Sequence, residues 1–350
     1  MLDIFITQET ERVIRSVDKN RTMLIIGSDA NRFNVNTISY YDSLEKAKME
    51  YGDSDLTKAF EVAQEIGAPH VFLLNMKNQI DYVDLIDVLK QYDFAYIVPI
   101  NIYISDYFLD AGKNNKRTYY AVDYMNRASY HNNSTIIFTD QHASLYEDID
   151  TFLEDMKVKV DEIYDSVPLH AKSNNIAFVA NNLERYPMSN VVLASALCSS
   201  EPGIYPSIKK TRAVFDIDNF DIDNYEIIYF KNNVSLEVTI ENLVNFNKEA
   251  MLLKSIFVDR IVKYILRTLD MSELHGKLYR AYHKVQAQRM LENYFEAIKG
   301  RMIREYTIDS IEFIHEAAGV GYMECTVSIW VNSTVGPYTL KLGGGSNIGN

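Results

Sequence analysis

The sequence predicts a mixed α/β fold: a mixed sheet with flanking helices, then a C-terminal helical pair and hairpin, with an extended strand arm at each end. Three observations lead to this prediction. Short apolar runs alternate with helical patterns along most of the chain, which is typical of parallel or mixed sheets. Two basic amphipathic helices precede a hairpin pattern near the C-terminus. Short alternating strands stand at both ends of the chain.

The first twenty residues are interpreted as an N-terminal arm. Leu2, Ile4 and Ile6 alternate with their neighbours, as in a short β-strand. A polar bridge at 10–22 joins this strand to the first buried strand. We therefore expect a detached strand at the start of the chain.

Residues 21–246 are expected to form an α/β core, either as one body or as two subdomains that divide near 165–185. Ser54 or Asp55 is placed to cap a helix that continues to Ile66 and ends at Gly67. Apolar residues at three- and four-residue spacing place further helices at 42–49, 81–91, 106–129, 145–160 and 187–200. Apolar or alternating runs place strands at 23–27, 70–75, 94–100, 135–139, 176–180, 225–230 and 234–240.

The region 247–332 carries a pair of helices and a hairpin. Val258, Ile261 and Ile265 recur at helical spacing. Asp270 and Glu273 then provide capping-box chemistry for a second helix, which continues to residue 302. Strands are expected at 306–314 and 323–331. Apolar and polar residues alternate in the second strand, which predicts one buried and one exposed face.

Residues 333–350 are interpreted as a C-terminal arm. Gly336 and Pro337 precede an alternating run at 338–342, and a glycine-rich end follows. A short strand without a hydrophobic partner of its own either frays or pairs with a sheet edge, in this chain or in another molecule.

The composition is that of a globular protein with an acidic charge balance. The 350 residues are 47% hydrophobic, and the net charge of -13 argues against a general nucleic-acid binder. Residues 248–304 nevertheless hold twelve Lys/Arg and six Asp/Glu, a balance of +6, which leaves -19 for the rest. The basic helices either face an acidic partner or are solvated.

The cysteines and the hydropathy indicate a chain that folds in a reducing compartment. Cys198 and Cys325 show no metal-ligand spacing and are expected to be reduced core residues. No apolar run is long enough to span a bilayer, and no signal peptide is expected, so we expect no membrane association.

No motif indicates a catalytic, cofactor or metal site. His315 begins a pattern similar to that of zinc proteases, but Gly319 stands where the second ligand would be. The strand at 23–27 ends in Gly27 and the loop 28–31, a place where α/β folds often bind nucleotides, but no glycine-rich phosphate motif follows. An acidic surface loop, in preference to a calcium site, is expected at Asp216, Asp218, Asp221 and Asp223.

Three ordered features resemble the sheath proteins of contractile phage tails and related contractile injection machines. The turn at 51–56 starts a helix that ends at Gly67 and leads into a buried strand at 70–74. A small-residue helix at 194–197 is followed by a Gly-x-x-Pro-Ser loop at 203–207. A helix at 254–269 carries Asp259-Arg260 near its centre and precedes a long helix and a hairpin. Many members of this family are longer because they carry additional outer domains.

The resemblance implies a structural protein, not an enzyme, and no cofactor. The implied function is that of a sheath subunit, which polymerises as a six-fold helical array around a tail tube and contracts to drive the tube through the host envelope. The implied partners are further copies of the chain, the tail tube protein, and the baseplate and tail terminator proteins. The implied location is the tail sheath of a virion, assembled in the bacterial host cytoplasm.

The resemblance also implies roles for particular residues. The two arms would add strands to sheets of neighbouring subunits, through Leu2, Ile4 and Ile6 at one end and Tyr338, Leu340 and Leu342 at the other. The basic helices would face the tube, and the candidate contacts are Lys263, Arg267, Arg280, Lys284 and Arg289.

Two alternatives remain open on the sequence. The first is an α/β enzyme that binds a nucleotide or a sugar phosphate near Gly27 to Asn31. It requires backbone amides directed at a phosphate from the start of a helix. The second is a tail or baseplate component that does not contract, shares the arms, and stops at a ring.

Overall fold

A computed structural model describes residues 5–27, 35–76, 89, 92–101, 134–166, 175–209, 211–215, 225–233, 237–246, 254–271, 281–315, 321–332 and 338–344. The chain divides into two compact units. Unit 1 comprises residues 1–201 and 205–259, and unit 2 comprises residues 202–204 and 260–350. The division lies thirteen residues beyond the predicted core boundary at 246.

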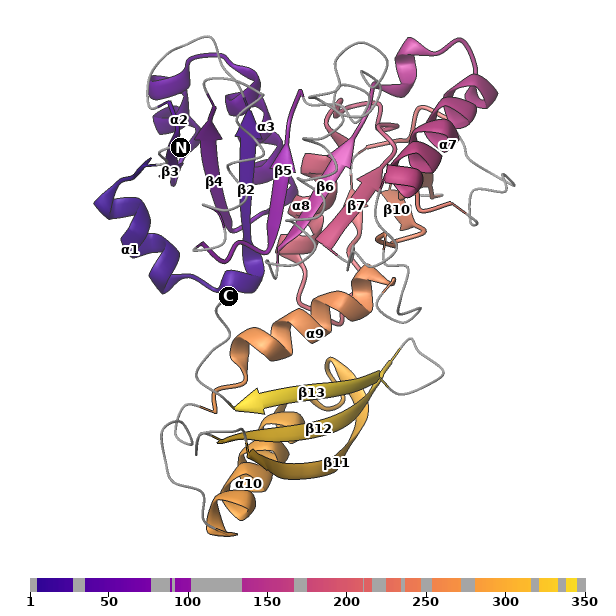
Figure 1. The fold of residues 1–350 in the computed structure, drawn as a ribbon. Helices are drawn as coiled ribbons and strands as arrows, with labels where there is room; N and C mark the ends of the chain where they lie inside the picture. Colours follow the sequence, from indigo (N-terminus) through magenta and orange to yellow (C-terminus); the bar gives the residue numbers. More distant parts are fainter. Residues whose placement is uncertain are drawn as a thin grey trace. The chain divides into compact units, whose positions relative to one another are not determined.

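Unit 1 is built on a seven-stranded mixed sheet with the order β1-β3-β4-β2-β5-β6-β7 (Figure 1). Among these strands only β3 and β4 pair antiparallel, so the mixed sheet predicted from the sequence is confirmed. β6 and β7, which lie on either side of the suggested division near 165–185, are hydrogen-bonded neighbours in this sheet. The strands are β1 Phe5–Ile6, β2 Thr22–Gly27, β3 Thr37–Tyr40, β4 His70–Asn75, β5 Tyr96–Pro99, β6 Thr135–Thr139 and β7 Ile176–Val179.

Helices cover both faces of this sheet and bury two apolar layers. Leu24 and Phe138 belong to the layer that also holds Phe152 of α7, whereas Ile25 and Val98 belong to the layer that holds Phe60 of α3. Alternate residues of one strand thus enter opposite cores, as the period of two requires. The helices are α1 Gln8–Ser16, α2 Leu44–Tyr51, α3 Asp55–Ile66, α7 Ile149–Ser166 and α8 Ser189–Ser199. A second small sheet has the order β8-β10-β9, formed by Ile208–Lys209, Glu237–Glu241 and Tyr229–Asn232.

The helix α3 confirms the predicted cap. The Ser54 hydroxyl accepts a hydrogen bond from the Thr57 amide at 3.2 Å, and the Thr57 hydroxyl accepts one from the Ser54 amide at 2.9 Å. Two amides that a helix start leaves unpaired are thereby satisfied. Gly67 ends the helix at a φ of 100°, in the left-handed region that favours glycine.

Helix α1 occupies the first part of the segment 10–22, so the prediction of a polar bridge there is wrong. Thr7 caps it by accepting a hydrogen bond from the Thr10 amide, and the buried Thr10 hydroxyl accepts one from the Tyr40 amide at 3.1 Å. Val13 and Ile14 pack against the core. With few apolar positions, this helix gives a weak periodic signal and depends on its cap and its docking.

Unit 2 contains the predicted C-terminal helices and hairpin, with α9 Ile256–Thr268 crossing the division between the units. The long helix α10 Ala281–Ile298 contacts β11 Ile303–His315, which pairs antiparallel with β12 Gly321–Val331. In β12, Cys325, Val327 and Ile329 are buried, whereas Thr326 and Ser328 are half-buried, which confirms the predicted alternation.

Several predictions fall outside the described residues. These are the helix at 106–129, the loop at 28–31 and the acidic loop at Asp216, Asp218, Asp221 and Asp223, while only residue 89 represents the helix at 81–91. None of the helices in the described ranges combines the length and the apolar character needed to cross a membrane.

Candidate functional site: the C-terminal sheet and its edges

The predicted C-terminal arm forms the strand β13, Tyr338–Gly344, on the edge of β12. Seven residue pairs join the strands, from Ile329 opposite Tyr338 to Met323 opposite Gly344. Leu340 and Leu342 are buried opposite Val327 and Cys325. The alternating run therefore does not fray in this chain but completes a three-stranded sheet of order β11-β12-β13. That it pairs with a neighbouring subunit stays a prediction.

The pairing of β13 places Cys325 in an apolar layer. Its side chain is 1% exposed, and burial, with a smaller contribution from Glu324, raises the pKa of the Cys325 thiol to about 11. Cys198 is also buried, and neither cysteine forms a disulfide, as predicted. A buried thiol with a raised pKa has little thiolate at neutral pH and is consequently unreactive.

The N-terminal arm contributes the two-residue strand β1. Phe5 and Ile6 pair parallel with Thr37 and Ile38 of β3, and the Phe5 amide donates to the Asn36 carbonyl at 2.8 Å. The Ile6 side chain is half-buried, but that of Phe5 is 61% exposed. Because a pairing of two residues fixes few hydrogen bonds, β1 is weakly held on its own body. Leu2 and Ile4 lie outside the described residues.

The five candidate tube contacts have different surroundings. Lys284 and Arg289 are exposed on α10, and Arg267 is half-buried on α9. Lys263 is only 6% exposed, so its side chain is covered within this chain, and its contact with a tube stays a prediction. Asp259 and Arg260 of α9 carry charged side chains and are also buried. Burial on this helix therefore extends beyond its apolar face. Arg280 lies outside the described residues.

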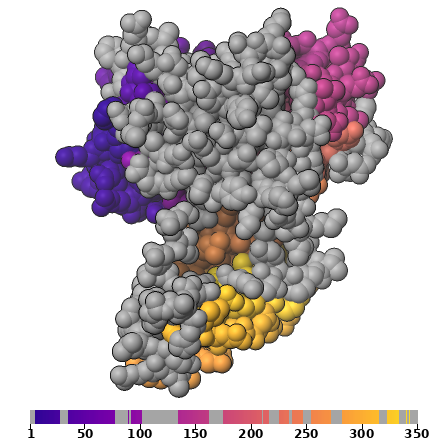
Figure 2. Space-filling model, in the orientation of Figure 1, coloured from indigo at the N-terminus to yellow at the C-terminus, as the bar shows by residue number. Residues whose placement is uncertain are grey.

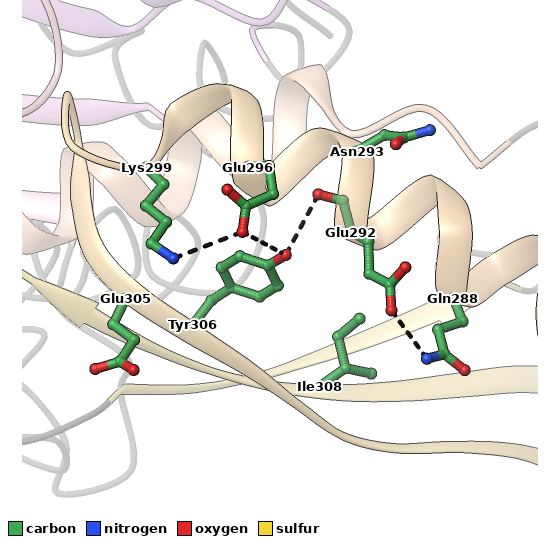
Figure 3. A pocket seen from close by; sticks show the side chains of 8 residues that line it. All are labelled: Gln288, Glu292, Asn293, Glu296, Lys299, Glu305, Tyr306 and Ile308. Carbon is green, nitrogen blue, oxygen red and sulfur yellow. Dashed lines mark hydrogen bonds and ion pairs between the residues drawn. The ribbon is translucent and has the colours of Figure 1, made fainter.

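A groove of about 610 Å³ lies between the second half of α10 and the first half of β11 (Figure 3). Tyr306 lies in it with its hydroxyl directed at α10, 3.1 Å from the Glu296 carboxylate and 3.5 Å from the Glu292 carbonyl. Its ring stacks on Phe295 of α10. Burial and these acidic neighbours raise the pKa of the Tyr306 hydroxyl, which therefore stays a neutral donor.

The groove is acidic, and sequence analysis did not identify it. Three carboxylates, of Glu292, Glu296 and Glu305, line it together with one ammonium group, that of Lys299. The Lys299 ammonium lies 3.6 Å from Glu296, and the Glu292 carboxylate accepts from the Gln288 amide at 2.9 Å. A cation can therefore be bound here by charge and by hydrogen bonds to carboxylates. In the sequence, each of these residues taken alone is typical of a solvated surface position, so no sequence pattern predicts the groove.

Gly27, beside the loop considered as a nucleotide site, packs closely against neighbouring side chains. In unit 1 the strand order reverses at β2, between β4 and β5, and Gly27 ends β2 there. A Cβ atom on Gly27 would lie 2.9 Å from Ile100 Cγ1 and 3.1 Å from Leu56 Cδ2. A side chain at this position would therefore force Ile100 or Leu56 to shift. The loop that would carry phosphate-directed amides lies outside the described residues.

Across the described ranges, no group of three or more His, Cys, Asp or Glu side chains is placed to hold a metal ion. Of the pair His315 and Glu316, Glu316 lies outside the described residues.

Comparison with known proteins gives similarity in structure but not in sequence. No protein-family model and no curated protein sequence matches the chain. The sheath tail protein of Listeria innocua aligns with a TM-score of 0.62 at 10% identity, over 95% of this chain and 96% of that one. The sheath tail protein of Desulfitobacterium hafniense aligns with a TM-score of 0.59 at 9% identity, over 92% of this chain and 95% of that one. A chain of the anti-feeding prophage baseplate in its contracted state aligns with a TM-score of 0.58 at 12% identity, over 88% of this chain and 87% of that one.

These similarities extend over nearly the whole of each chain, so they concern the complete architecture and not one common α/β layer. The chain therefore has the fold of the sheath proteins of contractile tails.

Proposed function

We propose that this chain is a structural subunit of a contractile tail sheath, which polymerises as a six-fold helical array around a tail tube. The fold similarity over nearly the full chain supports a structural role in a tail. Contraction would drive the tube through the host envelope, with the energy stored in an extended array above a contracted one of lower energy. No bound nucleotide or other cofactor is required by this mechanism.

The observation that carries the proposal is the strand β13. It pairs with β12 over seven residues and buries two leucines, yet it follows a short Gly336-Pro337 connection. The β13 strand of another copy offers the same hydrogen bonds and the same leucines to β12, so exchange changes the contact energy little. Each exchanged strand would then link two subunits while their bodies rotate between the extended and the contracted array.

The N-terminal arm and the basic residues supply the remaining contacts of the proposal. The β1 strand, weakly held on β3, is the second candidate for exchange between copies. Of the described candidates, Lys284 and Arg289 are free to approach an acidic tube protein, since their side chains are exposed. Baseplate and tail terminator proteins would bind the two ends of the array. The resulting location is the tail sheath of a virion, assembled in the host cytoplasm.

Electron microscopy of the purified full chain tests this function. We expect hollow tubes or stacked rings in negative stain, with an amount that rises with protein concentration. Rings that never extend into tubes would favour a tail or baseplate component that does not contract. A monodisperse monomer at every concentration would contradict both assignments.

A further inference from the structure

We propose that Lys159 and Asp140 of unit 1 condense to an amide, which links α7 covalently to the end of β6 with loss of water. The site is the group formed by these two side chains and Asp155. The reaction needs only one folded chain and is therefore independent of assembly. None of the contacts proposed for the sheath uses these three residues.

The amine and the carboxyl group lie within reach of each other. Lys159 Nζ lies 3.0 Å from Asp140 Oδ1, and the two side chains are 6% and 0% exposed. Because Oδ1 is bonded to Cγ, this carbon lies at most about 1.2 Å farther from the nitrogen. A nucleophile attacks from about 3–3.5 Å, so a small rotation of the Asp140 carboxyl group completes the approach.

The two oxygens of Asp140 have different surroundings. The Gln141 amide donates a hydrogen bond to Oδ1 at 2.7 Å. In contrast, Oδ2 is buried and has no hydrogen-bond partner among the described residues. The Gln141 amide can therefore stabilise negative charge that develops on Oδ1 during attack, while Oδ2 is the oxygen that leaves.

The site faces an apolar layer on one side only. Met156 and Val160, which flank Lys159 along α7, belong to the layer that also holds Phe152. Charges removed from water are costly, whereas the amide product carries none, so the condensation is favoured there. The other side of α7 lies at the surface, in the magenta region of Figure 2, and Glu154 is exposed on it.

Asp155 is placed to move the protons. Its Oδ2 lies 2.7 Å from Lys159 Nζ and accepts a hydrogen bond from the Tyr146 hydroxyl. Burial and this carboxylate raise the pKa of Tyr146, whose hydroxyl stays a neutral donor. The Asp155 side chain is 36% exposed, so water favours the charged state of the site and keeps the reactive neutral pair a minor population. The condensation is consequently slow, and freshly prepared chain holds mainly the ion pair.

The reaction balances without an oxidant or a further reactant. A proton moves from the Lys159 ammonium to the Asp140 carboxylate, which leaves an amine facing a carboxylic acid. The amine attacks Cγ, and Asp155 takes the second proton from the nitrogen. This proton passes to the departing oxygen, the bond between Cγ and Oδ2 breaks, and water leaves. One amide bond has formed, and one proton remains on its nitrogen.

Intact-mass spectrometry of the full chain during incubation at neutral pH tests the reaction. We expect a species lighter by one water, about 18 Da, whose share rises with time. Tandem mass spectrometry of its peptides should locate the link between positions 140 and 159. The Lys58 ammonium lies at the same distance, 3.0 Å, from the Asp55 carboxylate, but both side chains are exposed. This pair is the internal control and should stay unlinked.

Variants separate the roles of the residues. Lys159→Arg keeps the positive charge without the amine and should stay at its full mass. Asp155→Asn should slow the loss of water roughly tenfold or more, because it removes the proton acceptor. Asp155→Glu retains a carboxylate and should recover most of the rate. Circular dichroism of each variant establishes that it is folded.

Two results would overturn the inference. The first is a chain that keeps its full mass after several days of incubation. The second is an equal loss of water in Lys159→Arg, which would place the dehydration elsewhere in the chain. Either result would leave the proposed sheath function standing, because assembly does not require the link.

Discussion

A chain shortened by residues 337–350 is expected to lose tube formation. The deletion removes all seven pairs between β12 and β13 and the burial of Leu340 and Leu342. Without β13, no copy can donate this strand to the β12 edge of a neighbour, so we expect no tubes at concentrations at which the full chain assembles. Negative-stain microscopy and sedimentation of both chains at equal concentrations measure the effect.

The matched control for this deletion removes only residues 345–350, which follow the last described residue of β13. This variant keeps every pair between β12 and β13 and should assemble like the full chain. Tubes formed by the chain that lacks 337–350 would contradict a role for β13 in linking subunits, whatever else holds the array together.

Replacement of Lys159 by methionine is expected to reduce the free energy of unfolding by about 3–5 kcal/mol. The Lys159 ammonium on α7 lies 3.0 Å from Asp140 and 2.7 Å from Asp155. The Asp140 side chain, directly after β6, is fully buried, so the replacement leaves a carboxylate without a counter-ion in the core. Urea unfolding of the unassembled chain measures the loss.

Two further variants separate this pair from general effects of charge. Lys58→Met removes an exposed partner of Asp55 and should cost about 0–1 kcal/mol, as surface ion pairs do. Asp140→Leu combined with Lys159→Met removes both buried charges and should recover much of the stability. If Lys159→Met cost no more than Lys58→Met, the buried pair would not stabilise unit 1 in the way described.

The sequence predicts most closely those elements whose signal is local. The strands β4 and β6 begin and end at the predicted residues because each is a short apolar run bounded by polar positions. The Ser54 cap of α3 can likewise be predicted from the sequence, since the two residues that form it are only three positions apart. The strand β13 was recognised as a strand, but whether it would pair at all depends on an edge that β12 provides.

Features that depend on contacts distant in sequence were missed. Helix α1 has a polar sequence and is held by a cap and by docking to β3. The pair of Asp140 with Lys159 joins a strand end to a helix, with no pattern at that separation. The burial of Lys263 could not be predicted for the same reason, because a helical pattern gives the apolar face of α9 but not what covers its other side.

A disulfide between β12 and β13 tests the exchange of strands most directly. Cys325 lies opposite Leu342, so Leu342→Cys in a Cys198→Ala background places two thiols within the range of a disulfide. Oxidation needs a catalyst or raised pH, because the pKa of Cys325 is about 11. After oxidation of assembled tubes, strand exchange between copies predicts a ladder of covalent multimers in denaturing gels without reductant. Monomers that contain an internal link between positions 325 and 342, in tubes that are otherwise complete, would contradict it.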